Sequence, residues 1–112
     1  MKKIFALLAL ALSVNAFAGN IEAGKAVAQK YNCAACHGAD YNNPIDPSYP
    51  KLAGQHRDYL KHSLTAYQRG AEGANGRGNA IMGGIAKPMT RTEIEDVAAY
   101  LSSLPGSLVL RK

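Results

Sequence analysis

Two stretches in the first two thirds of the chain carry apolar residues at the spacing of an amphipathic helix. Residues 20–31 open with Asn20, which is a good helix N-cap. Their stripe consists of Ile21, Gly24, Val27, Ala28 and Tyr31. Residues 56–69 carry a second stripe, before Gly70, which consists of Tyr59, Leu60, Ser63, Leu64 and Tyr67. Both patterns predict helices, and a glycine directly after the second is typical of a helix end.

A third helix is predicted near the C-terminus. Thr90 and Glu93 have the spacing of a capping box, in which each side chain bonds to the backbone N–H of the other residue. Apolar residues follow at helical spacing: Ile94, Val97, Ala98, Leu101 and Leu104. Met89, directly before the box, is expected to act as a hydrophobic staple that packs onto Ile94. Pro105 and Gly106 end the pattern.

The stretches between these helices look irregular. Residues 40–54 contain three prolines, two asparagines and two aspartates, a composition typical of a loop. Residues 70–84 contain six glycines, and we predict a flexible connection whose backbone can approach another group closely. No stretch shows the strict alternation of a half-buried strand, so we predict an all-α fold.

The N-terminus has the pattern of a secretory signal peptide. Lys2 and Lys3 precede an apolar run over residues 4–14, and Ala16-Phe17-Ala18 supplies small residues for cleavage after Ala18. The run is shorter than the roughly 20 apolar residues that span a bilayer. We therefore expect residues 1–18 to be removed and residues 19–112 to form one domain in the periplasm, with no transmembrane segment after cleavage.

The charge of the mature chain excludes a nucleic-acid-binding role. Without Lys2 and Lys3, 11 basic residues stand against 8 acidic ones, a net charge of about +3. These charges are scattered, whereas a nucleic-acid footprint needs a dense basic face. A mild positive charge is compatible with docking to an acidic protein surface.

The chemistry of the chain centres on Cys33 and Cys36, its two cysteines, and on His37 directly after them. Two thiols so close could form a disulfide, although the bond would restrain little chain. A thioredoxin-like dithiol normally follows a strand, which the helical pattern does not supply. A zinc site would need a fourth ligand, for which His56 and His62 are the candidates. Cys-x-x-Cys-His is also the attachment motif of c-type haem, and this reading uses all three residues.

A haem iron has a second axial position, and its ligand would decide the chemistry. Met82, Met89, His56 and His62 are the candidates. Met82 is flanked by glycines, which would let the chain lie close over a haem face. Met89 is better explained as part of the core, and the two histidines fall on the polar side of the middle helix. We therefore favour Met82.

The order of these features resembles the small class I c-type cytochromes of bacteria. The similarity is greatest to one domain of cytochrome c4, and three stretches carry it: "CAACHGAD", "YPKLAGQHRDYLKHSLTAYQRG" and "IMGGIAKPMTRTEIEDVAAYLSSLPG". Cytochrome c4 resembles two such domains in tandem, whereas this chain contains one motif. A monohaem cytochrome, similar to the c5 and c553 groups, is therefore the better description.

The resemblance implies a class I cytochrome c fold, in which three main helices wrap around one covalently bound haem c. Cys33 and Cys36 would form the thioethers, and His37 and Met82 would bind the iron. Pro50 would present its carbonyl to the Nδ1–H of His37. The first and last helices would cross at Gly24 and Tyr100.

The resemblance also implies a function. It predicts a soluble, monomeric electron carrier, not an enzyme, that passes single electrons between a membrane donor complex and a terminal oxidase or reductase. A haem subunit or dedicated electron acceptor of a periplasmic dehydrogenase or sulfur-compound oxidase is the alternative. A catalyst or gas sensor would instead leave the distal iron position open.

Overall fold

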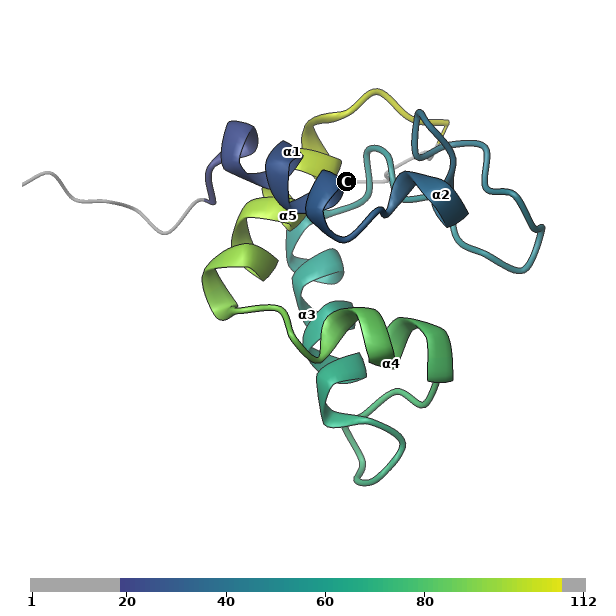
Figure 1. Cartoon of the computed structure of the whole chain (residues 1–112), viewed down its shortest axis with the longest axis vertical. Coiled ribbons are helices and arrows are strands. Elements are labelled where there is room, and N and C mark those ends of the chain that lie inside the picture. The colour runs from purple at the N-terminus through teal and green to yellow at the C-terminus, as the bar shows by residue number, and fades with distance from the viewer. Residues whose placement is uncertain (1–18, 108–112) are drawn as a thin grey trace, which may run out of the picture.

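The computed structural model describes residues 19–107, and these residues form helices and no strand (Figure 1). The helices are α1 (Ile21–Lys30), α2 (Ala34–His37), α3 (Arg57–Arg69), α4 (Ala80–Ala86) and α5 (Arg91–Ser103). The predicted all-α class and the three predicted helices are thereby confirmed. The expected signal peptide, residues 1–18, lies outside the described residues. Within those residues, no helix has the length and apolarity needed to cross a membrane.

Helices α1 and α5 lie against each other, as Figure 1 shows. The Asn20 side chain caps α1 by accepting from the Ala23 N–H at 2.9 Å, and the predicted capping box at Thr90 and Glu93 is present. Gly24 allows the close approach: a Cβ added there would lie 2.0 Å from the carbonyl oxygen of Asp96 and 2.7 Å from Cβ of Tyr100. The expected crossing at Gly24 and Tyr100 is thus confirmed.

The core lies mainly along α5, which packs against both α1 and α3. Its buried members include Val27, Ala28, Leu60, Met89, Ile94, Val97, Ala98 and Leu101. Two residues of the predicted stripes are exposed, Ile21 at 48% and Tyr59 at 50%. Ile21, in the first turn of α1, lines a surface hollow. Tyr59 instead contacts Arg77, whose guanidinium lies 5.5 Å from the centre of its ring.

The loop over residues 40–54 is irregular, as predicted, but it is firmly attached. The carbonyl of Tyr41 accepts from the N–H groups of Leu52 and Ala53 at 2.8 and 3.0 Å. The N–H of Gly54 donates to the carbonyl of Leu101 at 3.0 Å, which joins the loop to α5. Tyr41 is buried even though its φ is +57°, a conformation that side chains rarely adopt.

The glycine-rich stretch differs from the prediction over its second part. Residues 70–79 form no helix, but α4 occupies Ala80–Ala86, where we expected a flexible connection. The Asn79 side chain caps this helix by accepting from the N–H groups of Ile81 and Met82 at 3.0 and 2.9 Å. Gly83 and Ala86 are buried in a helix that packs against α3. Tertiary packing here overrides the low helix propensity of glycine.

Candidate functional site

Cys33, Cys36 and His37 share one face of a single helical turn. The carbonyl of Cys33 accepts from the N–H groups of Cys36 and His37, at 3.3 and 3.0 Å. Residues three and four apart in a helix point to the same side, so the two thiols and the imidazole lie together. Gly38 ends the turn with a φ of +92°, and its Cα lies so close to the backbone of Asn43 that a side chain would clash. The 40–54 loop can therefore fold back over α2.

The His37 ring is buried and held in one orientation. Its side chain is 6% exposed, and its Nδ1 lies 2.8 Å from the carbonyl oxygen of Pro50. A carbonyl can only accept, so Nδ1 carries the hydrogen and donates it. In the neutral ring the lone pair is then on Nε2, the nitrogen available to a metal. The Tyr49 ring stands beside His37, with ring centres 6.4 Å apart.

The two thiols do not resemble a reactive dithiol. Cys33 packs against the hydrophobic core, and burial raises the pKa of its thiol. Reactive cysteines require the opposite, a lowered pKa that favours the thiolate. Neither thiol is in a disulfide within the described residues. In that same part of the chain, no three His, Cys, Asp or Glu side chains come together as a metal site, so the zinc alternative has no ligand set.

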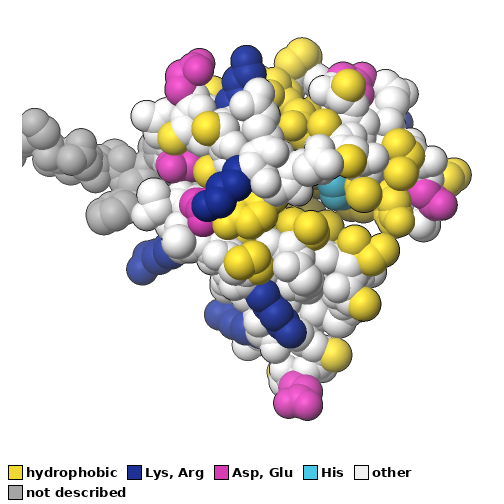
Figure 2. All heavy atoms as spheres, in the orientation of Figure 1, with side chains coloured by type: hydrophobic (Ala, Val, Ile, Leu, Met, Phe, Trp, Pro, Cys, Tyr) yellow, Lys and Arg dark blue, Asp and Glu magenta, His cyan; other side chains and the backbone are white. Residues whose placement is uncertain are grey.

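Figure 2 shows a hollow between the region of α2 with its following loop and the region of α4. Hydrophobic side chains surround the hollow, and one histidine side chain lies at its edge. Met82, half-buried, belongs to α4, the helix across from α2 (Figure 1). An apolar hollow and a turn that presents two thiols and one imidazole nitrogen fit a covalently attached haem.

The other candidate ligands occupy different environments. Met89 is 5% exposed and belongs to the hydrophobic core together with Ile94, in agreement with the role expected for it as a staple. His56 and His62 are exposed, at the start and on the surface of α3, as their polar positions predicted. Met89 packs within the core and the two histidines lie on the surface of α3, so their positions argue against all three as iron ligands.

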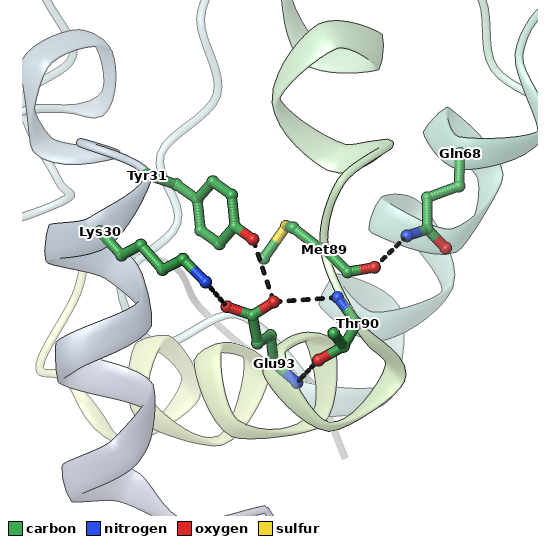
Figure 3. Close-up of polar contacts among 6 residues, drawn as sticks. All are labelled: Lys30, Tyr31, Gln68, Met89, Thr90 and Glu93. Atoms are coloured by element: carbon green, nitrogen blue, oxygen red, sulfur yellow. Dashed lines mark hydrogen bonds and ion pairs between the residues drawn. The ribbon is translucent and has the colours of Figure 1, made fainter.

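A polar cluster joins the end of α1, directly before the cysteine turn, to the start of α5 (Figure 3). Glu93 accepts from Lys30 Nζ at 2.8 Å, from the Tyr31 hydroxyl at 3.0 Å and from the Thr90 N–H at 3.0 Å. The bond from Lys30, followed by that from the Thr90 backbone, lowers the pKa of Glu93 from its ordinary 4.5 to about 2. Glu93 therefore stays ionised near neutral pH and fixes where α1 leads into the cysteine turn.

Sequence reasoning missed two residues, one beside His37 and one that joins α3 to the end of α4 and the start of α5. Tyr49 lies against His37, but its position in an irregular loop does not predict a partner. Gln68 sits on α3 and donates through Nε2 to the carbonyls of Ala86 and Met89, at 2.9 and 2.7 Å. No local pattern marks a glutamine whose partners are 18 and 21 residues away.

Several known proteins are similar to this chain in sequence. The sequence profile of the family described as cytochrome c matches residues 21–105. Cytochrome c4 of Stutzerimonas stutzeri is 39% identical over 116 aligned residues, which cover 96% of this chain and 53% of that protein. The thiosulfate dehydrogenase electron acceptor of Thiomonas intermedia is 38% identical over 76 residues, which cover 68% of this chain and 33% of that protein.

A solved structure has the same arrangement of helices. The crystal structure of reduced recombinant cytochrome c4 from Pseudomonas stutzeri superimposes with a TM-score of 0.71 at 41% sequence identity. The match covers 81% of this chain and 48% of that one. The chain thus spans about half the length, or less, of these relatives.

Proposed function

Because this chain belongs to the cytochrome c family, we propose that it is a monohaem c-type cytochrome that carries single electrons between redox proteins. Its fold is the class I cytochrome c fold, and the cofactor of the family is haem c, whose attachment motif Cys33, Cys36 and His37 fit. The cysteine turn is the observation that carries the proposal. It holds both thiols and one orientated imidazole on a single face.

Each residue of the proposed site has one role. Cys33 and Cys36 would hold the haem through thioethers, and His37 would bind the iron through Nε2. Pro50 keeps the imidazole in place by accepting from Nδ1, and this bond also raises the basicity of the ring. Met82 would bind the iron as well, through its thioether sulfur.

Two protein ligands on the iron favour electron transfer over catalysis. The haem supplies a reversible one-electron change between Fe²⁺ and Fe³⁺. With His37 and Met82 bound, no coordination position is left for a substrate, so we propose that the protein is not an enzyme. A thioether in place of a second nitrogen ligand raises the reduction potential. The hydrophobic side chains around the hollow would shield a bound haem from water.

We place this activity in the periplasm. The proposal rests on the signal-peptide pattern of residues 1–18 and on the resemblance, which together predict a mature domain of residues 19–112 that acts as a soluble monomer. Its partners would be a membrane donor complex and a terminal oxidase or reductase. Mass measurement of the exported protein tests the cleavage site directly.

A dedicated electron acceptor of one enzyme is the second candidate. The observation that favours it is the similarity to the thiosulfate dehydrogenase electron acceptor of Thiomonas intermedia. The same haem ligands would serve both functions. Reduction kinetics with a purified thiosulfate dehydrogenase and with a membrane donor complex separate them: a dedicated acceptor is reduced quickly by the first alone, and a general carrier by the second.

The haem and its ligands are tested by mass and absorption of the purified, exported protein. We expect the mass of residues 19–112 plus one haem, and in the ferric protein the weak band at the red end of the spectrum that marks sulfur bound to iron. Met82→Ala should abolish this band, and Met89→Leu, the matched control that keeps a buried side chain of similar volume, should retain it. A wild-type mass without haem would contradict the function, and a band that survives Met82→Ala would contradict the ligand.

A further inference from the structure

Helix α4, which carries Met82, is a weak helix in its own right. It has seven residues, and Gly83 and Gly84 lie within it. Helices this short are not stable alone in water, and interior glycine weakens them further. Of its residues, all of them described, Gly83 and Ala86 are buried, whereas Ile81 is 55% exposed. Met82 and Ile85 are only half-buried, so the position of α4 depends on how its two ends are attached as well as on its packing against α3.

The N-terminal end of α4 is attached on the surface. The Asn79 cap bonds to Ile81 and Met82 and so stays within the helix itself. Before it, the Arg77 N–H donates to the carbonyl of Ala66 at 3.0 Å, and its exposed guanidinium lies over the rings of Tyr59 and Tyr67. The guanidinium also donates to the Tyr59 hydroxyl at 3.3 Å, but exposed contacts of both kinds stabilise little, so the Arg77 side chain adds little to the hold on this end.

Besides the burial of Met89 in the core, the C-terminal end is attached by one half-buried side chain on α3. Gln68 Nε2 donates to the carbonyl of Ala86, the last residue of α4, and to the carbonyl of Met89, directly before the cap of α5. Figure 3 shows the second of these bonds. Ala86 is 0% exposed and Met89 5%, so both acceptors belong to buried residues. A carbonyl group in such surroundings raises the free energy of the folded state when it has no hydrogen-bond donor.

The chemistry of this bridge allows little substitution. Both partners are carbonyl oxygens, so the group between them must donate twice. A primary amide does so with its two hydrogens, whereas an ionised carboxylate of the same size presents lone pairs to two oxygens and repels them. The bridge therefore identifies residue 68 as a place where glutamine and glutamate differ sharply.

We propose that Gln68 is a positioning residue for the Met82 ligand. By joining α3 to the end of α4 and to the start of α5, it holds α4 in place and so keeps the sulfur of Met82 on the iron. This inference rests on the proposed role of Met82 and adds the residue that secures it. Loss of the bridge would let α4 move away and open the distal position.

The test compares Gln68→Glu with Gln29→Glu in the exported holoprotein. Gln29 is exposed on α1, so its substitution makes the same charge change away from α4. Carbon monoxide, which binds reduced iron only where the axial ligand gives way, is the probe. We expect Gln68→Glu to bind it about tenfold more tightly at neutral pH, the shift expected when ordinary hydrogen bonds are lost. Gln29→Glu should match the wild type.

Acidification provides a readout that a loss of packing would not move. Protonation of the new carboxyl in Gln68→Glu restores one donor, so its affinity for carbon monoxide should fall back toward the wild-type value as the pH is lowered. The red ferric band should return over the same range. A carbon monoxide affinity that equals that of Gln29→Glu at every pH would overturn the proposal while leaving the electron-carrier function intact.

Three further measurements cover the other outcomes. If Gln68→Glu yields no holoprotein, Gln68→Ala removes the donors without adding charge and should raise the carbon monoxide affinity in the same direction. In the wild type, both side-chain amide hydrogens of Gln68 should exchange slowly with solvent, and free exchange would overturn the bridge. A wild-type protein that lacks the red ferric band would instead overturn the Met82 ligand itself.

Discussion

Replacing Gly24 with alanine should destabilise the protein, although alanine is the better helix former. A Cβ at residue 24 would lie 2.0 Å from the carbonyl oxygen of Asp96, a backbone atom that cannot rotate away. Helices α1 and α5 would have to separate by an ångström or more at their closest point. The buried contacts near the crossing, which include those of Val27, Ala28 and Val97, would loosen as a result.

The expected size of the effect combines two terms of opposite sign. Forcing extra atoms into a packed core costs about 3 kcal/mol where the neighbouring atoms cannot yield. The helix propensity of alanine returns about 1 kcal/mol. The net loss is about 2 kcal/mol, a large part of the roughly 5–15 kcal/mol by which a small domain is stable. With a urea m-value of about 2 kcal/mol/M, the unfolding midpoint falls by about 1 M.

Urea unfolding of the ferric holoprotein, followed by helical circular dichroism, measures this change. Gly84→Ala is the matched control, because a Cβ there meets no atom within 4 Å and the backbone is not in the left-handed region. Gly84 also lies on the opposite side of α4 from Met82. It should be unchanged or more stable by up to about 1 kcal/mol. Equal stabilisation by both substitutions would refute the close crossing of α1 and α5.

Three further substitutions test other parts of the fold. Glu93→Gln should make the free energy of unfolding depend less on pH in acid. In the wild type this free energy falls as the pH drops from the ordinary pKa of 4.5 toward the folded pKa of about 2. Urea titrations at several pH values would detect the difference. Met89→Ala should cost about 3 kcal/mol in the same unfolding assay, since its side chain is 5% exposed in the core. Asn79→Ala should cost about 1 kcal/mol locally and speed hydrogen exchange at Ile81 and Met82, whereas unchanged exchange would contradict the cap.

Local features of the sequence were sufficient for much of the fold. The Asn20 cap and the Thr90–Glu93 box involve residues three apart, so their bonds form wherever the helix forms. The Cys33-x-x-Cys36-His37 motif likewise places its three side chains on one face through helical geometry alone. The prolines of the 40–54 loop excluded regular structure without reference to any neighbour.

Other features depended on partners far along the chain. Six glycines predicted a flexible connection over residues 70–84, yet packing of Gly83 and Ala86 against α3 forms a helix there. Tyr59 has the spacing of a core residue, but its ring is half-exposed beneath Arg77. Sequence periodicity reports which side of a helix is apolar, and it does not report how far the neighbouring element extends over that side.

The sequence alone therefore determined the helices with strong local signals and the residues suited to attach a haem. The tertiary structure decided how α4 is held, through the bonds of Gln68 to Ala86 and Met89, and which nitrogen of His37 is free, through its bond to Pro50. The physical reason is that caps and helical faces are set by residues within one turn. Carbonyl acceptors 13 to 21 residues away become partners only after the chain has folded.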